Sequence, residues 1–231
     1  MATTDRYHGP SDLPRELALF PLRGAILLPR ATLPLNIFEP RYLEMINDVM
    51  AGNRLIGIIQ PDVPAETSER LIESPKGNTS PLKRIGCVGR ATTYQELDDG
   101  RILVTLTGIA RFRLSKELQM QKPYRIGVAD WSDFAGDFKV GLGEDHVDRE
   151  ALLRVLRRYL DANRMQADWP VILKSSSEFL VNALSVMSPY GAEEKQALLE
   201  APNLKERAEV LVALAEMEMA AGSRGGGGMI Q

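Results

Sequence analysis

The side chains best suited to nucleophilic chemistry are scarce in this sequence. The chain has one cysteine, Cys87, and two histidines, His8 and His146. A nucleophilic cysteine requires a base and usually a third group that orients the base. His8 lies in a polar, turn-rich stretch, His146 follows a Gly/Asp-containing stretch, and Cys87 lies in an apolar, strand-like run. A free cysteine in such a run is commonly a small buried hydrophobe, so we expect Cys87 to be a core residue.

Acidic neighbours of His146 suggest a metal site at first sight. Glu144, Asp145 and Asp148 lie beside it in the sequence. A structural zinc site, however, requires four ligands, typically cysteine or histidine. A short acidic run at the start of a helix is more typical of solvated side chains that favour the helix dipole. We therefore expect no metal ion and no cofactor.

The run Lys174-Ser175-Ser176-Ser177 places a lysine beside serines, as a serine–lysine hydrolase would require. Adjacent residues on a helix do not face each other, and serines at a helix start commonly cap it. The nucleotide-binding pattern Gly-x-x-x-x-Gly-Lys-Ser/Thr is absent from the whole sequence. Its backbone cradle and lysine would be needed to hold phosphates. We expect no catalytic residues, so the chain is predicted not to be an enzyme.

Arg154, Arg157 and Arg158 fall near one face of a predicted helix because they are three and four residues apart. They could contact a phosphate, but pairing with Glu150 and Asp161 on a solvated face is the more common use of such residues. The whole chain carries 28 basic and 31 acidic residues, a net charge of −3. This balance argues against a dedicated nucleic-acid-binding protein.

Composition indicates a soluble globular protein. The 231 residues are 44% hydrophobic and 26% charged, which is ordinary for such a protein. One cysteine excludes a disulfide within the chain and favours a reducing compartment. The first 13 residues do not have the pattern of a signal peptide, and no apolar run approaches the length of a membrane span. We therefore expect a cytoplasmic protein without membrane contacts.

The first part of the chain is predicted to be rich in β-strands with one helix. Short apolar runs punctuated by prolines fill 17–38, and apolar residues at helical spacing predict a helix over 40–51. Strands are predicted over 55–60, 85–94, 101–114 and 124–131, with a hairpin turn at Asp98-Asp99-Gly100. The polar stretch 61–81 is a long loop. We expect a β-rich subdomain over 15–131, after a disordered N-terminus over 1–14.

The second part of the chain is predicted to be helical. After a linker over 132–143, helices are expected within 144–218: one with the apolar stripe 152–160, a second over about 172–187, a third from Ser188-Pro189 to Leu199, and a fourth opened by Asn203. Ser175 with Glu178, and Asn203 with Glu206, have the spacing of capping boxes. Residues 219–231, with four consecutive glycines, are expected to be a flexible tail.

Several stretches together resemble one known family. The most specific is the proline-punctuated segment Leu19-Phe20-Pro21-Leu22, then Leu28-Pro29, then Leu33-Pro34-Leu35-Asn36-Ile37-Phe38-Glu39-Pro40-Arg41-Tyr42. It is similar to the opening of the N-terminal domain of Lon proteases. Weaker matches in the same order are Gly86 to Gly89, then Asp99-Gly100 with Gly108 and Arg111-Phe112, then Glu194 to Glu200 with Glu206-Arg207. The resemblance covers about 15–218.

The resemblance implies a fold and a function. The Lon N-terminal domain is an α+β fold, with a β-rich pseudo-barrel similar to the PUA fold followed by a helical bundle. A complete Lon protease continues into ATPase and protease modules, which this sequence lacks. The resemblance therefore implies a stand-alone substrate-binding domain, and ATP hydrolysis and proteolysis are not carried over to it.

The leading hypothesis is binding of exposed segments of unfolded or damaged polypeptides. A groove between the subdomains, lined by Phe38, Tyr42 and residues of the 61–81 loop, would make apolar and therefore unselective contacts. Glu39 and Arg41 would add polar contacts to the peptide. Alternatively these two residues are structural, with Glu39 near a helix N-terminus and Arg41 paired with a carboxylate across the subdomain boundary.

Other functions remain open at this stage. The chain could dock as an adaptor or regulator on a separate Lon protease. A PUA-like subdomain could also bind RNA, although the sequence lacks the basic strands interleaved with aromatics that this requires. Any self-association is expected to give no more than a weak homodimer.

Overall fold

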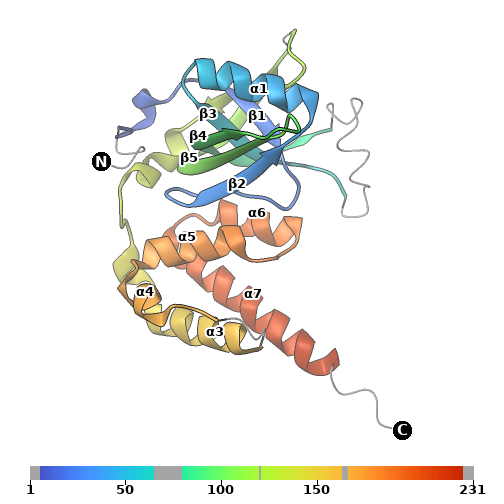
Figure 1. Ribbon diagram of the computed structural model, residues 1–231. Coiled ribbons are helices and arrows are strands. Elements are labelled where there is room, and N and C mark those ends of the chain that lie inside the picture. The colour runs from blue at the N-terminus through green and yellow to red at the C-terminus, as the bar shows by residue number, and fades with distance from the viewer. Residues whose placement is uncertain (1–5, 65–79, 120, 163–165, 226–231) are drawn as a thin grey trace.

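The computed structural model describes residues 6–64, 80–119, 121–162 and 166–225 (Figure 1). The strands are β1 (Glu16–Pro21), β2 (Thr32–Ile37), β3 (Leu55–Pro61), β4 (Leu82–Glu96), β5 (Ile102–Leu118) and β6 (Arg125–Asp130). The α-helices are α1 (Pro40–Ala51), α3 (Arg149–Ala162), α4 (Trp169–Lys174), α5 (Ser177–Met187), α6 (Ala192–Glu200) and α7 (Leu204–Gly225). Short 3-10 helices are η1 (Pro10–Asp12), η3 (Ser132–Phe138) and η4 (Glu144–His146). The α+β class expected from the sequence is confirmed.

The six strands form one sheet that closes on itself as a barrel. Neighbouring strands follow the order β2-β5-β4-β3-β1-β6, and β6 also pairs with β5. The closed ring therefore contains β5, β4, β3, β1 and β6, while β2 extends the sheet from β5. The hairpin predicted at Asp98-Asp99-Gly100 joins β4 to β5, and Gly100 has the positive φ of 84° that favours glycine there. Closure of the ring reduces the number of exposed strand edges.

Phe112 of β5 fills the barrel interior and is fully buried. Its partner in register on β4 is Gly86, where a Cβ atom would lie 2.6 Å from both the Phe112 ring and the Ile58 carbonyl oxygen. A Cβ atom at Gly57 of β3 would approach the same ring to 3.1 Å. Glycine at these two positions therefore creates the space that the ring occupies.

Helices cover two sides of the barrel. Helix α1 lies over one side, and α5 and α6 lie over the opposite side, below β2 in Figure 1. As predicted from its spacing, α1 buries Tyr42, Met45, Ile46 and Val49. One hydrophobic core includes residues of α1, of the strands and of α5, α6 and α7. The helices therefore share a core with the barrel that also includes Leu152 of α3, although α3 and α4 lie farther from the barrel than α5 and α6 (Figure 1).

Arg111 of β5 fixes the end of α6 against the barrel. Its guanidinium forms a buried ion pair of 2.9 Å with Asp137 of η3. It also donates hydrogen bonds of 3.1 Å and 2.6 Å to the carbonyl oxygens of Leu199 and Ala201. The last turn of α6 leaves such carbonyl oxygens without partners inside the helix. One side chain thus satisfies the helix end and joins it to the sheet.

Buried amides add further hydrogen bonds across the same junction. Arg207 of α7 donates to the Asn182 side-chain oxygen at 2.9 Å, and the Asn182 side-chain nitrogen donates to the Pro29 carbonyl oxygen at 3.1 Å. Gln60 of β3 donates to the Gln196 side-chain oxygen of α6 at 3.0 Å. Buried polar groups are costly unless they are hydrogen-bonded, so these bonds favour one position of the helices on the barrel.

The N-terminus and the expected linker are more ordered than the sequence indicates. Residues 1–5 lie outside the described residues, but Pro10–Asp12 form η1, and Tyr7 and Leu13 are buried in the second hydrophobic core. The disorder expected over 1–14 is therefore wrong from residue 6 onward. Most of the expected linker 132–143 is the 3-10 helix η3, which supplies the Asp137 that pairs with Arg111.

The helix expected over about 172–187 is divided into two. Helix α4 ends at Lys174, and Ser176 caps α5 by accepting a hydrogen bond from the Phe179 amide at 3.2 Å. The hydroxyl of Ser175 donates to a carbonyl oxygen of α4, and the carboxylate of Glu178 pairs with Arg30. The capping box predicted from Ser175 and Glu178 is therefore wrong, because the N-cap of α5 is Ser176 and not Ser175.

Two further helix boundaries differ from the prediction. Helix α6 has Gly191 as its N-cap, so Pro189 precedes the helix and does not open it. Helix α7 continues to Gly225, so the flexible tail expected from residue 219 is wrong as far as Gly225, and the rest of it lies outside the described residues. The cap at Asn203 is confirmed, since its side-chain oxygen accepts from the Glu206 amide at 2.9 Å. Among the described helices, none is long and apolar enough to cross a bilayer.

Candidate functional site

The four residues predicted from the sequence to bind a peptide lie between the end of β2 and the first turn of α1. They are Phe38, Glu39, Arg41 and Tyr42. Phe38 is 61% exposed. Tyr42 is buried, with its ring centroid 4.2 Å from that of Phe20. Glu39 forms an ion pair of 2.7 Å with Arg41, whose guanidinium carbon lies 4.6 Å from the centre of the Tyr42 ring. The expectation that Tyr42 lines a groove is wrong, because its side chain is buried. Arg41 pairs with Glu39, two residues earlier in the chain.

A cavity does lie between the barrel and the helices, but on the side away from α1. Its lining includes Pro61 and Val63 at the start of the expected 61–81 loop, and Tyr190 to Glu194 from the α5–α6 connection. Phe38 is not part of this lining. Residues 65–79 lie outside the described residues, so a role for the rest of the loop stays a prediction.

Cys87 is a buried core residue in β4. Its burial raises the pKa of the thiol, which keeps the sulfur protonated and therefore unreactive. We expect a thiol reagent such as dithionitrobenzoate to react with the native protein at least about a thousandfold more slowly than with the denatured chain, because reaction requires unfolding. Absorbance at the thionitrobenzoate band measures both rates. Equal rates in the two states would contradict the burial of Cys87.

The other residues considered for chemistry do not converge. The side chain of His146 is 70% exposed and lies 3.5 Å from Asp145, and the described part of the chain contains no cluster of His, Cys, Asp or Glu side chains suited to a metal ion. Lys174 ends α4, and Ser175 and Ser176 form the connection to α5, which begins at Ser177. Arg157 stacks on Trp169, with 4.5 Å between the guanidinium carbon and the ring centre, and no ion pair to Glu150 or Asp161 is formed within the described ranges.

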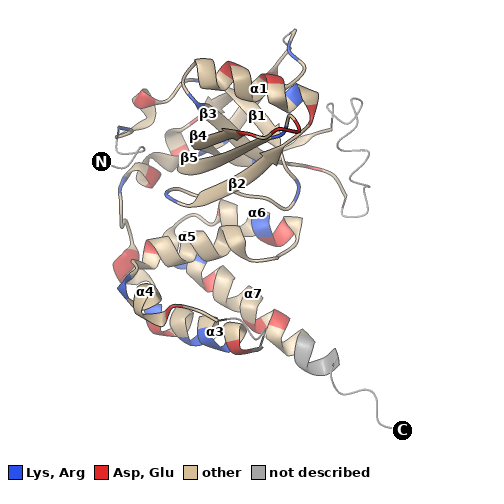
Figure 2. Ribbon diagram, in the orientation of Figure 1, with Lys and Arg blue, Asp and Glu red and all other residues tan. Residues whose placement is uncertain are grey.

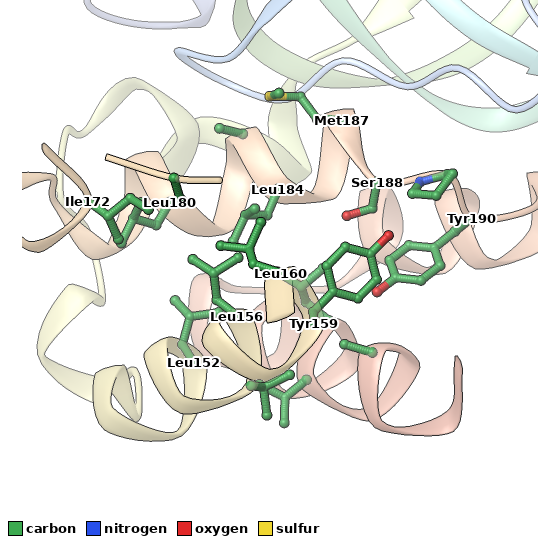
Figure 3. A pocket seen from close by; sticks show the side chains of 17 residues that line it. Leu152, Leu156, Tyr159, Leu160, Ile172, Leu180, Leu184, Met187, Ser188 and Tyr190 are labelled. Carbon is green, nitrogen blue, oxygen red and sulfur yellow. The ribbon is translucent and has the colours of Figure 1, made fainter. Parts of the chain in front are cut away.

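An apolar cleft opens among α3, α4, α5 and α7 (Figure 3). Its volume is about 260 Å³. Leucine, valine, isoleucine and alanine side chains form most of its wall. Its principal lining residues are Leu152, Leu156 and Leu160 of α3, Ile172 of α4, Leu184 of α5 and Val212 of α7. Apart from two tyrosines and a serine, the described lining has no side chain able to donate or accept a hydrogen bond. The cleft can therefore bind apolar groups.

The two tyrosines and the serine lie together at one end of the cleft. Figure 3 shows the rings of Tyr159 and Tyr190 side by side, with the Ser188 hydroxyl nearby, and Ile172 and Leu180 at the opposite end. Burial, with the carboxylate of Glu218 as a second cause, raises the pKa of Tyr190 to about 12. The same two causes raise the pKa of Tyr159. The cleft thus has an apolar end and a polar end that lies close to a negative charge.

The helices that form the cleft also carry exposed apolar side chains. Met187 at its rim is 78% exposed, and Val171, Leu173 and Phe179 on α4 and α5 are each more than half exposed. Large exposed apolar areas mark binding surfaces more often than isolated exposed residues do. From the sequence, the apolar stripe over 152–160 predicts a helix with one buried face. Helices α4 and α5 carry more apolar side chains than the neighbouring helices bury. This excess in the sequence was the signal for a cleft.

A sequence profile of the ATP-dependent protease La (LON) substrate-binding domain matches residues 16–216. The chain belongs to this family. The matched residues include the whole barrel, helices α3 to α6 and more than half of α7. Both the cleft and the cavity beside the α5–α6 connection therefore lie within the family's domain.

The similar curated proteins are Lon proteases. That of Flavobacterium johnsoniae is 26% identical over 203 residues, which cover 85% of this chain and 23% of the relative. That of Dictyoglomus thermophilum is 24% identical over 208 residues, which cover 85% of this chain and 24% of the relative. The chain spans about a quarter of the length of these relatives, so the activities of their remaining parts are not assigned to it.

Two solved structures have the same fold. A Lon N-terminal domain protein from Xanthomonas campestris has a TM-score of 0.58 and 22% identity, and the match covers 86% of this chain and 97% of that one. The N-terminal domain of the Mycobacterium avium complex Lon protease has a TM-score of 0.59 and 14% identity, with 87% and 98% covered. At these identities the likeness shows the fold alone.

Proposed function

We propose that this chain binds exposed apolar segments of unfolded or damaged polypeptides, and that the cleft among α3, α4, α5 and α7 is the principal binding site. The observation that carries the proposal is the cleft itself, with its apolar wall and the exposed Met187 in its lining. Membership of the Lon substrate-binding domain family supports a role in substrate binding. The binding role requires no catalytic residue, and we propose none.

The dimensions of the cleft limit what it can hold. Its volume of about 260 Å³ is below the roughly 300–1,000 Å³ of typical small-molecule pockets. A few apolar side chains of an extended or helical segment fit this space better than a complete folded surface does. Full burial of one large apolar side chain contributes about 1.5–3 kcal/mol. Binding is therefore expected to be weak and to tolerate many sequences, because apolar burial has no direction.

Fluorescence anisotropy with a labelled, permanently unfolded protein tests this proposal. We expect a dissociation constant on the order of micromolar, the range that two to four buried side chains would give. Because apolar contacts dominate, the constant should change little between low and moderate salt. RNA binding would instead weaken steeply with salt. If the folded protein shows no binding at high micromolar concentrations, the proposal is wrong.

Association with a separate Lon protease is a second candidate function. It is favoured by membership of the Lon substrate-binding domain family, since a related domain could contact a complete Lon protease. A pull-down with a complete Lon protease distinguishes the two functions. Retention of the protease without an unfolded polypeptide supports the adaptor function, whereas retention only through such a polypeptide supports substrate binding.

The segment Phe38 to Tyr42 remains a proposed second contact. Phe38 is exposed and could add an apolar contact at a distance from the cleft. Within this segment Tyr42 is buried, so a contribution from Tyr42 itself would require movement of α1. Any contribution from Glu39 and Arg41 would involve their ion pair as a unit.

A further inference from the structure

The polar end of the cleft borders the cavity beside the α5–α6 connection. Tyr190 lines both the cleft and that cavity. The cavity has a volume of about 470 Å³ and is polar at its α6 side, where Glu193 and Glu194 contribute to its lining. A polypeptide segment that leaves the cleft past Tyr190 would therefore pass from an apolar wall to a charged one.

Carboxylates predominate at this end of the site. Glu193 forms an ion pair of 3.1 Å with Lys83, which also pairs with Asp62. Glu194 and Glu218 take part in no ion pair among the described residues. In Figure 2 acidic residues lie at the start of α6 and along the later part of α7. Among the described residues of the cavity lining, the only cation is Arg23, whose guanidinium donates to the Pro64 carbonyl oxygen.

The arginines of α3 do not offset this charge within the site. Arg154, Arg157 and Arg158 are exposed and are not part of the cleft lining. Arg157 is held over Trp169. These three positive charges therefore lie on the outer face of α3 (Figure 2), whereas the carboxylates of Glu194 and Glu218 lie near Tyr190. The amine of Lys195 on α6 is buried and donates to the Ser185 and Val186 carbonyl oxygens.

We propose that the site is bipartite: the cleft binds an apolar anchor, and the carboxylates near Tyr190 bind a lysine or arginine that neighbours the anchor in the same polypeptide segment. This inference rests on the proposed function and specifies its substrate class. The hydroxyls of Tyr159 and Tyr190 stay protonated at neutral pH and can accept a hydrogen bond from the incoming cation. Apolar burial provides most of the affinity, and charge complementarity selects among segments with similar anchors.

A matched peptide series tests the inference. Labelled peptides share one leucine–phenylalanine anchor and carry lysine, glutamine or glutamate at the same position, placed on either side of the anchor in separate series. By anisotropy at low salt, we expect the lysine peptide to bind about three- to tenfold more tightly than the glutamate peptide, as two exposed charge pairs allow. The preference should shrink at high salt because exposed charges are screened.

Variants of the protein assign the preference to named carboxylates. The double variant Glu194→Gln with Glu218→Gln should lose the preference and keep its affinity for the glutamine peptide. Glu216→Gln is the control, since Glu216 lies on the same helix as Glu218 and is likewise exposed, but only Glu218 is close enough to raise the pKa of Tyr159 and Tyr190. Equal affinities for the three peptides, or a preference that survives in the double variant, would overturn the inference and leave the proposed function intact. Failure of even the glutamine peptide to bind would overturn both.

Discussion

Replacement of Arg111 by methionine is expected to lower the free energy of unfolding by about 3–5 kcal/mol. The substitution leaves the carboxylate of Asp137 in a buried position without its partner, with only 10% of that side chain exposed. It also removes the donors to the carbonyl oxygens of Leu199 and Ala201 at the end of α6. Both losses fall on the junction between barrel and helices, so we expect the two parts to unfold together at lower denaturant concentration.

Arg113 provides a matched control on the same strand. It pairs with Asp133 at 2.7 Å, but the two side chains are 46% and 50% exposed. Arg113→Met should therefore cost no more than about 1 kcal/mol, as exposed ion pairs do. Urea denaturation followed by circular dichroism measures both variants. Equal small losses for Arg111→Met and Arg113→Met would contradict the structural role assigned to the buried pair.

Replacement of Ala183 by tryptophan is expected to weaken the binding of an unfolded polypeptide at least about tenfold, because the added side chain occupies the cleft that would otherwise bury one of its apolar side chains. Ala183 lies on α5, lines the cleft and is partly exposed, so there is room for the larger side chain. Overpacking of a site that is not fully buried should cost no more than about 1–3 kcal/mol in stability.

Ala213→Trp is the control for the added tryptophan. Ala213 lies on α7, is exposed and is not part of the cleft lining. Anisotropy titrations of both variants, after circular dichroism has verified their folding, give the comparison. If both variants keep the affinity of the original chain, the cleft is not the binding site.

The local elements could be predicted from sequence where one face of an element is buried and the other is not. The stripe of Tyr42, Met45, Ile46 and Val49 predicts α1 because only one face of that helix meets the barrel. The Asp-Gly turn predicts the β4–β5 hairpin because Gly100 adopts a positive φ. Closure of the barrel by β5 and β6 depends on pairing between separate strands, which local spacing does not determine.

The junction and the cleft were missed for different reasons. Arginine is a residue type that usually lies on the surface, so the sequence does not predict that Arg111 and Arg207 are buried. Their burial depends on the carbonyl and amide groups with which residues of other elements bind them. In the cleft, Leu152 and Leu156 have the same spacing as core residues, because a helix face that borders a cavity and one that borders a core are equally apolar. Tyr42 was expected to line a groove but is buried. Its position beside the charged residues Glu39 and Arg41 does not distinguish an exposed ring from a buried one.

Photocrosslinking from two exposed positions tests the central claim most directly. Benzoylphenylalanine would replace Met187 at the rim of the cleft in one variant and Phe38 before α1 in another, since these side chains are 78% and 61% exposed. After irradiation with a bound unfolded polypeptide, mass spectrometry compares the crosslinked fractions. We predict strong crosslinking from position 187 that competes with excess unlabelled polypeptide. Crosslinking confined to position 38 would contradict the assignment of the cleft as the principal binding site.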